Sequence, residues 1–390
     1  MAANSFSALA PVNFMPKVQA FLNQRLVAKM ISRTEFRAQL RSGQQIDWPY
    51  VSRGRVQTYT PGTDLMIDTN TAVSDTMSIN QSKAVTFTLD PNQQAQAEDK
   101  GMAALMADQY AFDLASYIDQ ALLKEGIDYA ANTVAGGTLD ASNIYKKLTD
   151  CLATLQRRNA GGTKFAVLDP ERVALLAQVE VANGFNVADN ALMNGFVGNS
   201  QAGFKVYMSN NLPTSVAYTM DTINTAGKTF TIAGVTFTFV ANGTASSAGD
   251  ISIGANVGEN QANFLLAIAG TATGSASTYI DVSKEDRRML QNMQISASAF
   301  DTNVSTITGF GKLNASTNSA DGNNALDTET GSLLAGDIGA ISLGMQIQPT
   351  MASAPEPARP METNYAIHTL YGKKVFYRDT FRLVDFTINV

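Results

Sequence analysis

A long helical pattern that begins at Asp90 constrains this chain more than any other feature of its sequence. Asp90 can cap a helix and Pro91 suits the first helical position, because the amide at that position has no helical partner. Apolar residues then recur at helical spacing, at Met102, Met106, Tyr110, Leu114, Tyr117, Ala121 and Leu122. A helix over residues 91–125, ended by Gly126, would be about 50 Å long, since each residue adds about 1.5 Å. We therefore expect a helix longer than is usual in a globular domain.

The residues before this helix change from helical to strand-like patterning. Residues 17–41 place apolar side chains three or four apart, which predicts a helix that Gly43 ends. Residues 46–89 are richer in Thr, Val and Tyr, and the alternation around Val85 and Phe87 predicts half-buried strands. A Pro-Gly turn and modest apolar content indicate a long two-stranded ribbon. So thin a ribbon is not stable alone, and we expect it to lie on another surface.

The remaining chain alternates helices and strands. The patterns predict a helix at 144–155, a strand at Lys164–Leu168, a helix at 170–179, strands at 204–208 and 341–347, and terminal strands from Ala366 onward. Cys151 falls in the apolar stripe of the first of these helices. We interpret it as a small core residue rather than a reactive thiol.

A separate unit is predicted within residues 219–334, where the composition shifts. Residues 230–239 alternate as a hairpin, and Ser283 with Asp286 three residues later forms a capping-box signal. Strands and helices interleave there around their own apolar set. We therefore expect an independent α+β unit inserted into a host domain that contains the strands on both sides of it.

Charge is distributed unevenly along the 390 residues. Of the net charge of −6, residues 1–60 contribute +6 and the rest −12. A basic arm can lie on the acidic body of another copy, which makes seven residues interface candidates: Arg25, Lys29, Arg33, Arg37, Arg41, Arg53 and Arg55. The alternative is that the first five form the solvated face of one helix. Nucleic acid is a weaker partner, because the acidic body repels phosphate and no basic stripe is interleaved with aromatic residues.

Reactive chemistry is almost absent from the sequence. The chain has one His, His368, and one Cys, so a multi-imidazole metal site, a zinc ribbon and a Cys/His nucleophile pair all lack residues. Residues 161–164 lack the spacing of a phosphate-binding loop, and residues 321–329 fail the order of an EF-hand. The N-terminus has no signal-peptide pattern, and no apolar run approaches the roughly 20 residues of a membrane helix. We expect no enzyme, cofactor, metal or membrane contact, and a protein made and used in a cytoplasm.

The order of these elements, together with several short motifs, resembles a known family. The long helix opens with DPNQQAQAEDKG, a central segment reads GFKVYMSNNLP, and the last sheet contains NYAIHTLYGKKVF. The most specific positions are Gly203, Phe204, Val206, Ser209, Asn210, Leu212 and Pro213, followed by Leu370, Tyr371, Gly372 and Val375. In combination with the basic arm, the ribbon and the insertion, they resemble the major capsid proteins of tailed bacteriophages, which have the Hong Kong 97-like fold.

The resemblance implies an α+β, Hong Kong 97-like chain with peripheral and axial domains. The boundaries it implies are an N-terminal arm at 1–45, an extended loop at 46–89, a spine helix and peripheral domain at 90–180, an axial domain at 181–218 and 335–358, an insertion at 219–334, and peripheral terminal strands at 359–390.

The resemblance also implies a function. Such proteins self-assemble into hexameric and pentameric capsomers of an icosahedral head shell, which encloses double-stranded DNA without sequence-specific binding. The implied partners are further copies, a separate scaffolding protein, a portal and a cement or decoration protein, and the implied location is the virion capsid, assembled in a bacterial cytoplasm. The alternative is a secreted adhesin or flagellin-like surface protein, suggested by the Thr-, Ser-, Asn- and Gly-rich second half. The long central helix and the single insertion argue against that alternative.

Overall fold

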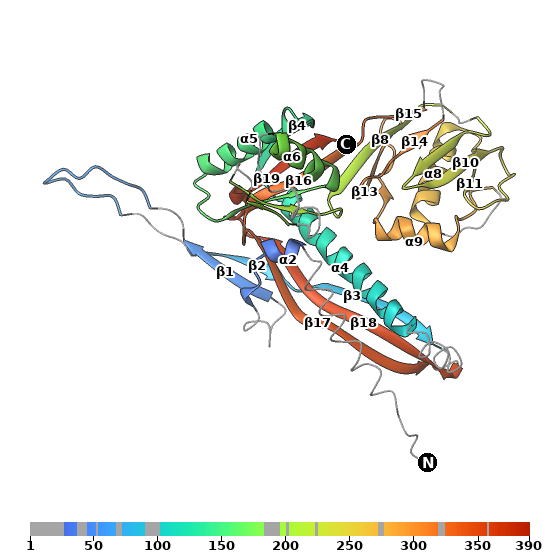
Figure 1. Ribbon diagram of the computed structural model, residues 1–390, viewed down its shortest axis with the longest axis horizontal. Coiled ribbons are helices and arrows are strands. Elements are labelled where there is room, and N and C mark those ends of the chain that lie inside the picture. The colour runs from blue at the N-terminus through green and yellow to red at the C-terminus, as the bar shows by residue number, and fades with distance from the viewer. Residues whose placement is uncertain are drawn as a thin grey trace, which may run out of the picture. The chain divides into compact units, whose positions relative to one another are not determined.

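The computed structural model divides the chain into two compact units (Figure 1). The described residues are 27–36, 45–51, 54–67, 72–89, 102–182, 196–199, 203–222, 225–271, 277–318, 324–356 and 359–390. The first unit is drawn from Met1–Ala115 and Ile338–Thr380, and the second from Ser116–Asp337 and Phe381–Val390. These boundaries do not coincide with those predicted for the peripheral and axial domains, whose assignment stays a prediction.

The first unit is built mainly from strands. Its elements are α2 (Val27–Ile31), β1 (Gln45–Val51), β2 (Ala72–Ser78), β3 (Gln81–Leu89), the start of α4 (Met102–Asp128), β17 (Ile341–Glu356) and β18 (Arg359–Val375). β1 and β2 form a two-stranded sheet, and β17, β18 and β3 form a three-stranded sheet in that order. β18 buries alternate side chains, including Tyr365, Ile367 and Tyr371, so one face of this sheet carries the core.

The position of β3 corrects one prediction. The strand predicted from its alternation is confirmed, but β3 is not part of a two-stranded excursion over 46–89. It pairs antiparallel with β18, from Gln81 opposite Tyr371 to Leu89 opposite Thr363. The ladder with β18 pairs one edge of β3 and makes it part of a three-stranded sheet, which is more stable than a two-stranded ribbon. The ribbon therefore consists of residues 45–78, meaning β1, β2 and the chain between them.

The helix predicted at 17–41 is also corrected. In its described part, α2 ends at Ile31. The amide of Arg33 then donates to the carbonyl of Ile341 at 2.7 Å, and the carbonyl of Arg33 accepts from the amide of Leu343 at 3.0 Å. The edge of β17 thus takes up backbone groups that a longer helix would pair internally. The rest of the predicted helix lies outside the described residues.

The long helix is confirmed as α4 from Met102 onward, whereas its predicted start at Asp90 and Pro91 lies outside the described residues. It continues through Gly126, the predicted end, to Asp128. The amide of Tyr129 still donates to the carbonyl of Glu125 at 3.2 Å. Ile127 is buried beyond the glycine, so packing keeps the last turn helical although glycine is a poor helix former.

The second unit contains a ten-stranded sheet. Its elements are the rest of α4, β4 (Asn132–Thr138), α5 (Ile144–Arg157), β5 (Lys164–Leu168), α6 (Pro170–Ala182), β6 (Phe196–Asn199), β7 (Lys205–Met208), β8 (Pro213–Met220), β9 (Thr229–Ile232), β10 (Val235–Val240), β11 (Asp250–Ser252), α8 (Val257–Ala269), α9 (Lys284–Asn292), β12 (Ser296–Ala297), β13 (Val304–Phe310), β14 (Ser316–Thr317), β15 (Asn324–Leu326), β16 (Thr330–Asp337) and β19 (Leu383–Asn389), the last preceded by the short turn η3 (Thr380–Arg382). The large sheet runs β12-β13-β8-β16-β5-β7-β6, with β15 joined to β8 and β19 joined to β16 and β4.

Two elements of this unit confirm their predictions directly. α5 turns Ile144, Leu148, Cys151 and Leu155 into the core, and β5 is buried along its whole length. Burial raises the pKa of the Cys151 thiol to about 12, because a charged thiolate is poorly solvated there. Cys151 is therefore a protonated core residue, as the sequence indicated.

The predicted insertion packs around an apolar core that it shares with β8, because Val216 and Tyr218 of that core precede residue 219. β9 and β10 form the expected hairpin within a four-stranded sheet, and Phe264 of α8 packs its ring against those of Tyr218 and Phe230 at 5.1 Å between centroids. The hydroxyl of Ser283 accepts the amide of Asp286 at 3.1 Å at the start of α9. This contact confirms the capping signal read from the sequence.

The connection of the insertion to its host differs from the prediction. β8 pairs with β13 and β15 inside the inserted segment and also with β16, so the segment is continuous with the large sheet. The two strands expected in one host domain are separate: β7 belongs to the large sheet of the second unit and β17 to the three-stranded sheet of the first. Alternation identifies a strand, but the partner of a strand is decided by residues far away in the sequence.

Candidate assembly interface

The ribbon is anchored at its root by one apolar face. β1 and β2 pair Ile46 with Met77, and both side chains are buried in a cluster with Phe36 and Phe376. Two residues further along β1, Trp48 meets Phe36 edge-on at 5.7 Å and stacks on Phe376 at 5.9 Å between ring centroids. Because alternate strand residues share a face, these side chains form one continuous contact.

The distal part of the ribbon, loop 54–67, is held together by polar contacts. The side chain of Gln57 donates to the carbonyl of Met66 at 2.7 Å and accepts from the amide of Met66 at 3.0 Å. At the tip, the amide of Thr63 donates to the carbonyl of Thr60 at 3.1 Å. These bonds fix the shape of the loop without enclosing any core.

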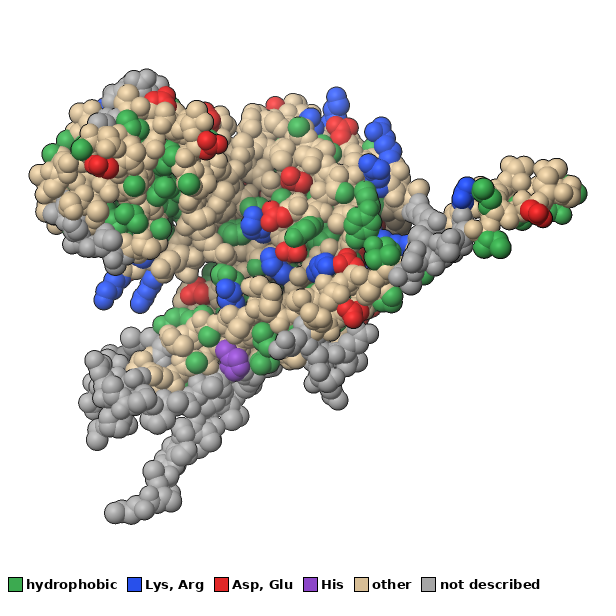
Figure 2. Space-filling view, turned by 180° about the vertical axis from the view of Figure 1, so that it is seen from behind, with side chains coloured by type: hydrophobic (Ala, Val, Ile, Leu, Met, Phe, Trp, Pro, Cys, Tyr) green, Lys and Arg blue, Asp and Glu red, His purple; other side chains and the backbone are tan. Residues whose placement is uncertain are grey.

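Loop 54–67 exposes large apolar side chains to solvent. Val56 and Ile67 are 98% and 95% exposed. The other large exposed apolar residues of the loop are Tyr59, Leu65 and Met66. Figure 2 shows apolar side chains along this projecting loop, where the sequence supplies only Arg55 and Asp64 as charges. A set of uncovered apolar side chains of this kind marks a contact surface.

Arg33, one of the predicted interface residues, is used within its own unit. Its guanidinium carbon lies 5.2 Å from the centroid of the Trp48 ring, and its Nη1 lies 3.8 Å from Oδ2 of Asp379. The first is a cation–π contact, and the second is a long ion pair of small energy. Arg33 therefore fixes the root of the ribbon to its own subunit.

Of the other predicted residues, the structure describes Arg55 and Lys29. Arg55 lies on the exposed loop with its Nη1 3.7 Å from Sδ of Met66, whereas Lys29 is half-buried in α2. The remaining candidates lie outside the described residues and stay predictions: Arg25, Arg37, Arg41 and Arg53. The sequence reading missed Val56 and Ile67, because isolated apolar residues in a loop produce no periodic signal.

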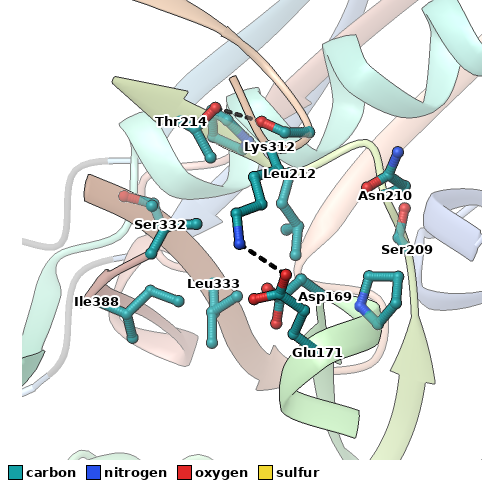
Figure 3. A pocket seen from close by; sticks show the side chains of 15 residues that line it. Asp169, Glu171, Ser209, Asn210, Leu212, Thr214, Lys312, Ser332, Leu333 and Ile388 are labelled. Atoms are coloured by element: carbon teal, nitrogen blue, oxygen red, sulfur yellow. Dashed lines mark hydrogen bonds and ion pairs between the residues drawn. The ribbon is translucent and has the colours of Figure 1, made fainter. Parts of the chain in front are cut away.

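The second unit holds a cavity of about 180 Å³ (Figure 3). Much of its wall is apolar, from Leu212, Pro213, Pro170, Leu333, Ile388 and Val390. Nζ of Lys312 donates to Oε1 of Glu171 at 2.7 Å at the cavity. Burial raises the pKa of Asp169, which caps α6 by accepting the amide of Arg172 at 3.2 Å. Both carboxylates have cationic partners, and no His lines the cavity. The hydroxyl of Ser209, in the cavity wall, donates to Oδ2 of Asp119 at 3.1 Å.

Metal-ligating clusters and membrane-spanning helices are absent from the described part of the chain. Among its residues, no group of three or more His, Cys, Asp or Glu side chains is placed to hold a metal ion. No described helix combines the length and the apolar character needed to cross a membrane.

Comparison with known proteins finds similar structures but no matching sequence family. No family model matches the sequence, and no curated protein matches it. A structure from Mycobacterium phage Che8 is 13% identical, with 93% of this chain and 91% of that chain covered and a TM-score of 0.52. A structure from Mycobacterium phage Ogopogo is 11% identical, with the same coverage and a TM-score of 0.51. The chain has the Hong Kong 97-like fold of phage capsid proteins.

The capsid fold confirms the α+β class and the resemblance stated from the sequence. At these identities the likeness concerns the fold alone, and it extends over almost the whole length of both chains.

Proposed function

We propose that this chain is a capsid shell protein, many copies of which assemble into the hexameric and pentameric capsomers of an icosahedral head around double-stranded DNA. The observation that carries the proposal is a ribbon on a capsid fold that leaves Val56 and Ile67 almost fully in water. A monomer gains nothing from these side chains. A lattice of identical copies covers them at every repeat.

The energetics favour burial of the ribbon on a neighbouring copy. Covering a Val or Ile side chain completely contributes about 1.5–3 kcal/mol, and the contact recurs once per subunit. The root of the ribbon is already held by its own unit, so less conformational freedom is lost when the loop docks. A weak contact per copy then becomes a stable shell through repetition.

The proposal includes partners and a location. The remaining basic interface candidates would lie on the acidic body of another copy: Arg25, Lys29, Arg37, Arg41, Arg53 and Arg55. A separate scaffolding protein would guide assembly, a portal would occupy one vertex, and a cement or decoration protein would bind the finished shell. The shell would be assembled in the host bacterial cytoplasm and remain as the virion capsid.

The direct test is the assembly state of the purified chain, alone and co-expressed with a scaffolding protein. We expect capsomers, closed shells or irregular polymers in negative-stain images and on a sizing column. A monodisperse monomer at high concentration under both conditions contradicts the proposal. Regular filaments would favour the flagellin-like alternative.

A sharper test introduces charge into the loop. Val56→Asp and Ile67→Asp place a carboxylate where apolar cover is expected, so assembly should fail while circular dichroism stays unchanged. Thr58→Asp adds the same charge to the same exposed loop and serves as the matched control. Equal loss of assembly in all three variants would assign the effect to charge and remove the ribbon as the interface.

A further inference from the structure

The ribbon rests on one short segment of its own subunit. We call residues 374–378, at and after the end of β18, the seat. The rings of Phe376 and Tyr377 stack on Trp48 and Tyr50 of β1, at 5.9 Å and 6.2 Å between centroids. Two successive aromatic residues of the seat thus stack on two alternate residues of one face of the ribbon.

Polar contacts join the same two segments. Nζ of Lys374 bonds a carboxylate oxygen of Asp75 in β2 and also donates to the carbonyl of Thr76 at 2.7 Å. The other carboxylate oxygen of Asp75 accepts the backbone amide of Tyr377 at 2.9 Å. A single carboxylate therefore binds both a side chain and the main chain of the seat.

A cationic residue closes the outer end of the seat. The guanidinium of Arg378 lies over the ring of Tyr50 at 5.2 Å and donates to the carbonyl of Val51. Burial falls outward along this face, from Ile46 at 2% exposed to Trp48 at 38%. Asp75 lies opposite Trp48 in the ribbon register, between the closed inner part and the open outer part.

We propose that Asp75 and the seat form a latch that fastens the ribbon to its own subunit and sets its direction. Releasing the carboxylate breaks the bonds of Asp75 to Lys374 and to the Tyr377 amide, and so loosens the outer part of β1 and β2 on residues 374–378. The three-stranded sheet does not depend on the latch, because β17, β18 and β3 are joined by their own ladders. The latch is thus a joint between a rigid sheet and a movable ribbon.

Hydrogen exchange of the full chain, followed by mass spectrometry, tests the latch without any need for assembly. Asp75→Ala should accelerate amide exchange in residues 45–51 and 72–78 by about tenfold or more, since it removes charge-assisted hydrogen bonds. Exchange in β18 should stay unchanged. Asp47→Ala is the control, because Asp47 lies in the same ribbon and accepts only from the Thr76 hydroxyl, at 2.7 Å.

A double-mutant cycle with Lys374→Ala completes the test. If the two residues act as one latch, the acceleration of exchange in the double variant is clearly smaller than the product of the accelerations in the two single variants. Asp75→Asn, which keeps an acceptor for the Tyr377 amide, should give an intermediate rate and replaces Asp75→Ala if that variant does not fold. Three outcomes overturn the proposal: Asp75→Ala matching Asp47→Ala, equal acceleration in β18, or full additivity with Lys374→Ala.

Discussion

Two excursions of this chain, the ribbon in the first unit and the inserted segment in the second, differ in where they bury apolar side chains. The inserted segment packs Phe230, Phe239 and Phe264 around one another, and all three are inaccessible to solvent or nearly so. Among its described residues, the ribbon buries Ile46 and Met77 at its root and exposes its distal loop. The inserted segment buries its apolar side chains within a single chain, whereas the exposed apolar side chains of the ribbon need another surface to cover them.

The comparison teaches that strand content alone does not decide whether a segment is stable. Both excursions contain an antiparallel strand pair, and the pair in the ribbon, with seven residue pairs, is longer than the β9–β10 hairpin, with four. A two-stranded pair has no interior, whereas a sheet covered by a helix such as α8 excludes water from one face. The missing layer over the ribbon is the physical reason to expect an intermolecular contact there.

The largest expected effect is a difference between isolated fragments. A fragment of residues 213–329 should fold cooperatively, because it contains β8 and nearly all of the apolar cluster around Phe264. A peptide of residues 45–78 should remain unfolded, because its root partners lie elsewhere in the chain. Circular dichroism with urea denaturation distinguishes them. Amides protected from exchange in the isolated ribbon peptide would contradict the claim that the ribbon is unstable on its own.

Single substitutions should show the same contrast on a smaller scale. Phe264→Ala removes a buried ring and should lower the free energy of unfolding by about 3–5 kcal/mol. Ile67→Ala removes a side chain that is already in water, so its effect should stay within about 0.5 kcal/mol. Urea denaturation of the unassembled chain measures both. Similar losses for the two variants would show that loop 54–67 packs in its own subunit.

A pH effect should separate the ribbon root from the insertion. Burial alone would raise the pKa of Asp75, but the hydrogen bonds from Lys374 and the Tyr377 amide and the charge of Lys374 outweigh it and lower the pKa. A lowered folded pKa means that the stabilisation is present above the unfolded value of about 3.9 and is lost as pH falls through the folded pKa.

Amide protection at the root should therefore decrease on acidification below about pH 4, while protection in β9 and β10 serves as the internal reference. Asp75→Asn should lose this pH dependence. An unchanged acid response in that variant would assign the effect to another group.

The smallest expected effect concerns the basic arm. Arg37→Glu with Arg41→Glu should slow assembly at low salt, although each exposed pair is worth only about 0–1 kcal/mol. The Debye length falls from about 10 Å at 0.1 M salt to about 3 Å at 1 M, so wild-type assembly should slow toward the variant rate. Light scattering against salt concentration measures both chains. Equal rates at low salt would favour a solvated arm.

Elements with local signals could be predicted from the sequence. The stripe of α5, the hairpin of β9 and β10 and the cap at Ser283 each depend on residues within a few positions of one another. The sheet to which β3 or β17 belongs depends on a partner far along the chain, and no local pattern encodes it. α2 shows the same limit, because the edge of β17 takes over at Arg33 and ends the helical pattern.

The candidate site was predictable only in outline. Low apolar content indicated that the ribbon needs a surface, and the charge of the arm directed attention to its basic residues. The sequence could not show that Trp48 and Asp379 engage Arg33, or that Val56 and Ile67 project into solvent. Both facts follow from tertiary contacts of residues that have no special spacing in the sequence.

Trp48 is the only tryptophan among the 390 residues, and it lies at the root of the ribbon between Phe36 and Phe376. Intrinsic tryptophan fluorescence of this protein therefore originates from one position per copy. Because the indole is partly open to solvent, a soluble quencher can reach it, and any movement of the ribbon changes how easily it does so. The unmodified chain thus contains its own optical probe at the joint where the ribbon meets the sheet.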